Sequence, residues 1–133
     1  MIVADTNLVL HFLVEGEKST SADQVFARDS EWHMPVLWRS EFTNALATLV
    51  RARRVSASTA TEALRRGLTT FGTREHAVDA ERAMQLAISS GCTAYDCEFI
   101  CVAEQLAALV ITYDKAVLRA FPKLAMSPDD FLA

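Results

Sequence analysis

Four carboxylates stand where the predicted elements of the chain begin or end. Asp5 and Asp114 each follow a short apolar run, whereas Glu41 and Asp96 border the apolar stripes of helices. Folding could therefore bring all four acids into one cleft. Four such charges would repel one another by about 3 kcal/mol per close pair, for separations of ~5 Å and an effective dielectric constant near 20. This repulsion predicts a divalent cation between them.

The side-chain types indicate hydrolysis of a phosphate ester. Carboxylate oxygens bind hard cations, and Mg²⁺ is held by a few carboxylates, several waters and the phosphate of a substrate. Such an ion lowers the pKa of a bound water and polarises the phosphoryl oxygen, and a second ion would stabilise the leaving oxygen. We expect Asp5 and Asp96 to bind the metal directly and Asp114 to bind it directly or through water. Glu41 is expected to orient the attacking water or to act from the outer shell.

Each acid also has a structural explanation. Asp5 and Asp114 stand at helix starts, where Asp is a favoured N-cap. Asp96 lies three residues after Thr93, which is the spacing of a capping box. Glu41 has no cation at helical pairing distance and is the hardest to explain by local structure. For a single acid the two explanations are nearly balanced, but the four together favour function.

The bulk properties of the chain fit one globular domain over residues 1–133. Its 133 residues are 51% hydrophobic, which allows a sizeable core. The run after Met1 lacks the features of a signal peptide, and no apolar stretch is long enough for a membrane span. The cysteines Cys92, Cys97 and Cys101 match neither a disulfide framework nor a zinc site. We therefore expect a cytoplasmic protein with reduced thiols and no membrane contact.

The charge balance argues against bulk attraction to nucleic acid. The net charge is −4, from 13 basic and 17 acidic side chains, and the four acids described above account for it. Basic residues cluster at Arg51, Arg53 and Arg54, which could contact the phosphates of a nucleic acid. A solvated helix end explains this cluster equally well. The histidines show no metal-ligand spacing, so we assign them no role.

Short apolar strands alternate with helices along the chain. The pattern predicts strands at residues 2–4, 32–34, 75–78 and 109–112. It predicts helices at 8–14, 21–28, 35–53, 57–68, 79–89 and 93–106, with Pro35 opening the third, Ser56 capping the fourth and Gly91 ending the fifth. Strands separated by helices favour right-handed crossovers, so we expect a three-layer α/β/α domain with a mainly parallel sheet. Ligands of such sheets bind beyond the carboxyl ends of the strands, where Asp5 and Asp114 should share an edge.

The ordered motifs resemble those of the PIN-domain ribonucleases. The matching segments are Asp5-Thr6-Asn7, Glu41 early in an apolar helix, Tyr95-Asp96-Cys97 leading into residues 99–104, and Val110-Ile-Thr-Tyr-Asp114. Their order and spacing and the chain length are similar to the toxin subfamily called VapC, and the resemblance covers essentially the whole chain. Each motif alone is weakly specific, whereas the ordered set is specific.

The resemblance implies a cytoplasmic Mg²⁺- or Mn²⁺-dependent endoribonuclease, inhibited by a co-produced VapB-like antitoxin and commonly a homodimer. By position, it assigns the metal site to Asp5, Glu41, Asp96 and Asp114, and polar support to Thr6, Asn7 and Thr112. Two features depart from the family pattern. Cys97 stands where a small Ala is common, and the segment after the last motif lacks the extra acids that would support a second metal ion.

An antitoxin would need a docking surface, and the front of the chain carries many large apolar side chains. They are His11 to Val14, Trp32, Trp38, Phe42 and Leu46. We expect an apolar groove beside the acids that receives an amphipathic helix, from which a basic residue reaches the carboxylates. The alternative is that these side chains complete the core of the domain.

Three other functions stay open. The protein could be a stand-alone RNA-processing PIN nuclease, a catalytically idle module that binds RNA or protein, or a phosphoacceptor receiver domain. A receiver needs adjacent acids after its first strand and a lysine at a strand end, whereas this chain has one acid there and Lys115 beyond its last predicted strand. Intact acids at all four positions argue against an idle module.

Overall fold

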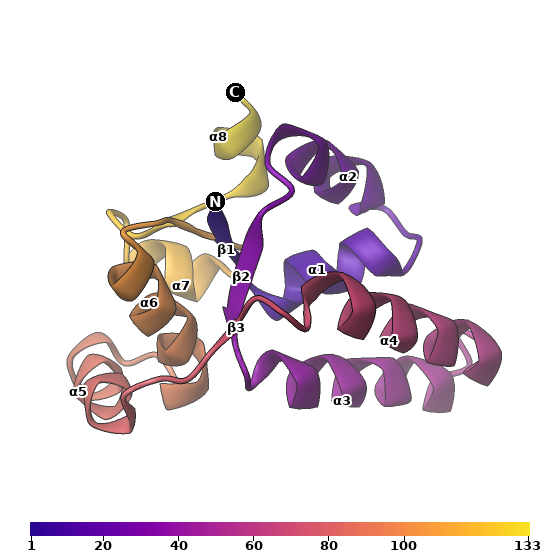
Figure 1. Ribbon diagram of the computed structural model, residues 1–133, viewed down its shortest axis with the longest axis horizontal. Helices are drawn as coiled ribbons and strands as arrows, with labels where there is room; N and C mark the ends of the chain where they lie inside the picture. The colour runs from indigo at the N-terminus through magenta and orange to yellow at the C-terminus, as the bar shows by residue number, and fades with distance from the viewer.

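The computed structural model describes residues 1–133 and shows a five-stranded sheet between two layers of helices (Figure 1). The strands are β1 (Ile2–Ala4), β2 (Trp32–Pro35), β3 (Glu75–His76), β4 (Val110–Ile111) and β5 (Ala125–Met126). The helices are α1 (Thr6–Leu13), α2 (Ser19–Arg28), α3 (Trp38–Arg51), α4 (Ala57–Phe71), α5 (Ala80–Ser90), α6 (Ala94–Leu106), α7 (Lys115–Ala120) and α8 (Pro128–Leu132). All strand pairs are parallel, which confirms the expected three-layer α/β fold.

The strand order is β3-β2-β1-β4-β5, so that β2 and β3 lie on one side of β1, and β4 and β5 lie on the other. Helices α1 to α4 lie on one side of the sheet and α5 to α7 on the other (Figure 1). The chain therefore leaves β1 towards one face and leaves β4 towards the opposite face. Such a topological switch point leaves a crevice beyond the carboxyl ends of the strands. Ala4 pairs with Ile111, so Asp5 and Thr112 take matching positions at the mouth of this crevice.

The core contains the aromatic side chains that we expected in a docking groove. Trp32, Trp38 and Phe42 are 0% exposed and Leu46 is 3% exposed. Trp32 stacks on Phe71 with ring centroids 5.4 Å apart. The groove prediction is therefore wrong for these residues, because the layer formed by α1 to α4 needs them to fill its own interior.

Pro35 does not open a helix, contrary to our prediction. It ends β2, and α3 begins three residues later at Trp38. The N–H groups that β2 donates to the β3 side come from Met34, to Arg74 O at 3.2 Å, and from Val36, to His76 O at 3.2 Å. No hydrogen bond between these strands therefore needs an N–H group at Pro35, and proline is tolerated there.

Several local predictions are confirmed by backbone and capping geometry. The Ser56 hydroxyl accepts from Thr59 N at 3.1 Å, and the Thr93 hydroxyl accepts from Asp96 N at 3.1 Å. Gly91 ends α5 with a φ of 77°, in the left-handed region that favours glycine. All three cysteines are free thiols.

The individual helices are too short or too polar to cross a bilayer. No single helix has both the length and the apolar composition needed to cross a membrane. Helices α5 and α6 reach that length and composition only as a pair, and they are bent by 115° at the break between them.

Candidate active site

The crevice at the switch point contains a cavity of about 250 Å³ that all four predicted acids line. Asp5 follows β1 and Asp114 follows β4, whereas Glu41 and Asp96 lie in the first turns of α3 and α6. The parallel register brings the two strand ends together, and one helix from each outer layer adds an acid. The predicted residues therefore meet in space although they are far apart in the sequence.

Asp5 is the most tightly held of the four carboxylates. Its Oδ2 accepts a hydrogen bond from Thr112 Oγ1 at 2.5 Å, and its Oδ1 accepts from the backbone N–H of Thr6 at 2.8 Å. Asn7 Nδ2 donates more weakly to the same Oδ2, at 3.5 Å. Because Thr112 is 0% exposed, its hydroxyl is fixed by the core, and it fixes the orientation of the Asp5 carboxylate in turn.

Thr112 and Asn7 also join the loops that follow β1 and β4. Asn7 Nδ2 donates to Thr112 Oγ1 at 3.3 Å, and Asn7 Oδ1 accepts from the backbone N–H of Tyr113 at 3.3 Å. The backbone N–H of Asp114 donates to Thr112 Oγ1 at 3.0 Å. These bonds hold Asp114 in a set position relative to Asp5.

Asp114 and Glu41 line the cavity and also accept hydrogen bonds that hold the local structure together. Asp114 Oδ1 caps α7 by accepting from Ala116 N at 2.8 Å and Val117 N at 3.2 Å, which leaves its second oxygen for another partner. Glu41 Oε1 accepts from the Thr6 hydroxyl at 2.7 Å. Thr6 thus connects Glu41 to the Asp5 segment, and Asn7 and Thr112 connect Asp5 to Asp114.

No basic side chain compensates the negative charge of the carboxylates in the cavity. Burial raises the pKa of Asp5 from 3.8 to about 6, and the charges of Glu41 and Asp96 add to this increase. Burial also raises the pKa of Glu41 and of Asp96, with contributions from Asp96 and Asp114, respectively. None of the four acids forms an ion pair with a basic side chain. A cation bound here would therefore relieve both the desolvation and the mutual repulsion of the carboxylates.

The donor set suits a hard, strongly hydrated cation. No three carboxylate, imidazole or thiol groups of the protein lie close enough together to form a metal cage. Mg²⁺ does not require one, because it usually keeps several waters and binds through one or two carboxylates and a substrate phosphate. The uncompensated carboxylates of this cavity fit such a water-rich site.

Two residues that sequence reasoning missed complete the wall of the cavity. Leu10 and Ala45 line it together with the acids. Helical spacing could have found them, because Leu10 lies three residues after Asn7 and Ala45 lies four residues after Glu41.

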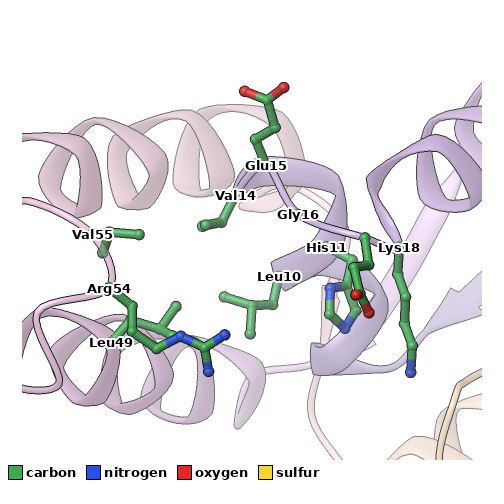
Figure 2. Close-up of a pocket in the computed structure, with 10 residues that line it drawn as sticks. Leu10, His11, Val14, Glu15, Gly16, Lys18, Leu49, Arg54 and Val55 are labelled. Carbon is green, nitrogen blue, oxygen red and sulfur yellow. The ribbon is translucent and has the colours of Figure 1, made fainter.

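A larger groove of about 600 Å³ adjoins the acid cavity and shares Leu10 with it. Its apolar walls are formed by Leu10 and Val14, in and just after α1, by Leu49 of α3, and by Val55 between α3 and α4 (Figure 2). Glu15 points away from the groove in this view. The groove that we expected beside the acids therefore exists, but smaller aliphatic side chains line it in place of the aromatic ones.

The predicted basic cluster is divided by this groove. Arg54 lines it, with the guanidinium group pointing towards Leu10 (Figure 2), whereas Arg51 and Arg53 do not line it. All three side chains are exposed. Lys18 and His11 lie at the other end of the groove. His11 and Val14 belong to the set that we expected in a groove, whereas no motif or spacing in the sequence singles out Lys18.

The raised pKa of Asp5 predicts a pH dependence of stability in the metal-free protein. A folded-state pKa of about 6 against an ordinary value of 3.8 means that the folded state binds this proton more tightly than the unfolded state does. The free energy of unfolding should therefore fall as the pH rises from about 4 to about 6, by at most about 3 kcal/mol from this group. Urea denaturation in EDTA of the parent and of Asp5→Asn across this range isolates the contribution, and parallel curves would contradict it.

Comparison with known proteins independently supports the family resemblance that the sequence motifs indicate. The family model described as PIN domain matches residues 2–124. Ribonuclease VapC3 of Pyrobaculum aerophilum is 26% identical over 126 residues, which cover 92% of this chain and 96% of that protein.

Solved structures show the same fold. The crystal structure of PAE2754 from Pyrobaculum aerophilum has a TM-score of 0.79 at 21% identity, covering 98% of this chain and 92% of that one. A toxin-antitoxin complex from Klebsiella pneumoniae has a TM-score of 0.67 at 17% identity, covering 96% of this chain and 98% of that one. Since the family match extends over nearly the whole sequence, this chain belongs to the PIN domain family.

Proposed function

We propose that this protein is a Mg²⁺- or Mn²⁺-dependent endoribonuclease that hydrolyses RNA phosphodiester bonds and acts as the toxin of a toxin-antitoxin pair in the cytoplasm. The observation that carries the proposal is the convergence of four unpaired carboxylates on one cavity at the switch point of the sheet. The similarity to a protein named Ribonuclease VapC3 supports RNA as the substrate. The PIN family match also argues against a phosphoacceptor receiver domain.

The proposed mechanism gives each acid a role that fits its surroundings. Asp5 and Asp96 would hold the metal directly, and Asp114 would hold it directly or through water with the oxygen that α7 leaves uncapped. When bound, the metal supplies a more acidic water and neutralises charge on the phosphate. Glu41 would orient the attacking water and accept its proton, because burial raises its pKa. Thr6, Asn7 and Thr112 would keep these carboxylates in place.

The adjoining groove is the proposed site for the antitoxin. Its aliphatic walls suit the apolar face of an amphipathic helix. Leu10 separates the groove from the acid cavity and lines both, so a basic side chain of the partner could reach the carboxylates and displace the metal. The fold is shared with a toxin-antitoxin complex from Klebsiella pneumoniae.

The proposed homodimer would use a different surface. Helix α5 exposes Met84 by 53% and Ile88 by 76%, and neither residue lines the groove or the acid cavity. Pairing through this face would leave both the groove and the cavity accessible.

Removing one carboxylate tests the nuclease. Asp96→Asn should lower RNA cleavage by more than about 100-fold, because it removes a metal ligand. Its thermal stability should stay equal or rise, since the substitution relieves repulsion with Asp114. Cleavage of structured RNA is measured in Mg²⁺, Mn²⁺ and EDTA, with Glu62→Gln as a control that removes an exposed charge from α4. Near-normal cleavage by Asp96→Asn would remove this residue from the mechanism.

The basic cluster has its own test. Replacing Arg51, Arg53 and Arg54 together by Gln should weaken RNA binding and lower the slope of log affinity against log salt by about 0.7 for each phosphate that is no longer neutralised. The control replaces the exposed Arg65 and Arg66 of α4. An unchanged slope in the triple variant would assign the cluster to a solvated surface.

The antitoxin groove is tested by co-expression with the small reading frame expected beside the gene. Leu49→Gln places a polar group in the groove and should abolish co-purification through a single tag, while RNA cleavage is retained. Glu62→Gln on the exposed face of α4 is the control and should co-purify normally, because Glu62 does not line the groove. If no partner frame exists, or its product neither co-purifies nor suppresses cleavage, a stand-alone RNA-processing nuclease becomes the better conclusion.

A further inference from the structure

A second hollow opens beside the acid cavity, where Asp96 forms the wall. It has a volume of about 460 Å³, within the range of about 300–1,000 Å³ that is typical of ligand sites. Ser90 at the end of α5 and Cys92 and Thr93 of the following loop form one wall, and Ala116 and Arg119 of α7 form the other. We call it the α7 hollow.

The α7 hollow adjoins the acid cavity. Asp96 lines both of them, just as Leu10 lines both the cavity and the large groove. The acid cavity therefore adjoins two depressions, the large groove through Leu10 and the α7 hollow through Asp96. An extended chain that places one group among the acids could place its next group in either of these neighbouring depressions.

Arg119 is the only basic side chain that lines the α7 hollow. It is exposed, and it forms no ion pair or hydrogen bond with any residue of the protein, including Asp96. The charge that raises the pKa of Asp96 comes from Asp114, and no cation opposes it. Arg119 is thus close enough to share a hollow with the acids but is not used to neutralise them.

The lining of the hollow selects the kind of group that fits. It contains no aromatic ring on which a base could stack. The side chains opposite Arg119 are small or polar, and a guanidinium group presents a planar fork of donors that matches a phosphate. The hollow therefore suits the backbone of a nucleic acid better than its bases.

We propose that the α7 hollow binds the RNA phosphate next to the scissile one, with Arg119 as the positioning residue. The inference rests on the proposed ribonuclease function and deepens it by defining the path of the strand. Arg119 lowers the repulsion between the acidic cavity and the RNA backbone and sets the register of the strand, without contacting the reacting atoms. Because it contacts phosphate, its contribution is the same for every base sequence.

The test measures RNA binding separately from cleavage. Fluorescence anisotropy with short labelled single-stranded RNAs of different sequence is recorded in Ca²⁺, with gel analysis to verify that the RNA stays intact. Arg119→Gln should weaken binding to all sequences alike and lower the slope of log affinity against log salt by about 0.7 to 1. Arg119→Lys should retain most of the slope, and Arg119→Glu should weaken binding further.

The control is Lys123→Gln, which removes an exposed cation just before β5 that does not line the α7 hollow. It should leave the salt slope unchanged. Isothermal titration of Mn²⁺ should give the same affinity for Arg119→Gln and the parent, because Arg119 does not touch the acids.

The outcomes separate the two hypotheses. If the parent binds and cleaves RNA but Arg119→Gln has the parental salt slope, or Lys123→Gln changes it equally, the α7 hollow is not a phosphate site and the nuclease proposal survives. If the parent neither binds nor cleaves RNA, both proposals fail. A sequence-dependent effect of Arg119→Gln would also overturn this inference, since it would indicate contact with a base.

Discussion

The hydrogen bond from Thr112 to Asp5 joins the two strand ends on which the acid cavity depends. It spans 2.5 Å between residues that are 107 positions apart in the chain. The same hydroxyl accepts from the backbone of Asp114 and from Asn7, so a single buried threonine orients one carboxylate and places the turn that carries another. The bond exists only because β1 and β4 are parallel neighbours with Ala4 opposite Ile111. The geometry of the cavity therefore depends directly on the topology of the sheet.

Without a cation, the buried carboxylates lower the stability of the folded protein. Burial raises the pKa of three of the acids, and no basic side chain offsets their charge. The rest of the domain must supply the compensating stability, and its connected core of 28 buried residues includes the stacked Trp32 and Phe71. The aromatic side chains near the front of the chain are thus needed inside, where they hold α1 to α4 against the sheet. This requirement explains why they are absent from the groove.

The sequence predicted the fold class and the meeting of the acids because both follow from periodicity and from the geometry of parallel strands. Asp5 and Asp114 had to share an edge once their strands were recognised. The sequence could not show which apolar side chains face inward, since Trp38 and Leu49 belong to the same helix and differ only in which neighbours cover them. It also did not reveal β5, whose two residues are too few to show a period. Pro35 was assigned to the wrong element because a strand end and a helix start accept proline equally well.

The surroundings of the acid cavity differ on its two sides, and this difference bears on control of the enzyme. On the Leu10 side the walls are aliphatic and suit a helix, whereas on the Asp96 side they are polar and carry one unpaired arginine. A protein partner in the first groove could reach the carboxylates without covering Arg119. An inhibitor of this kind would act by occupying the acids, and the α7 hollow would stay accessible. Because the groove also carries an arginine without an ion pair, Arg54, the feature that distinguishes the two sides is the lining of the groove by leucine and valine side chains, which the hollow lacks.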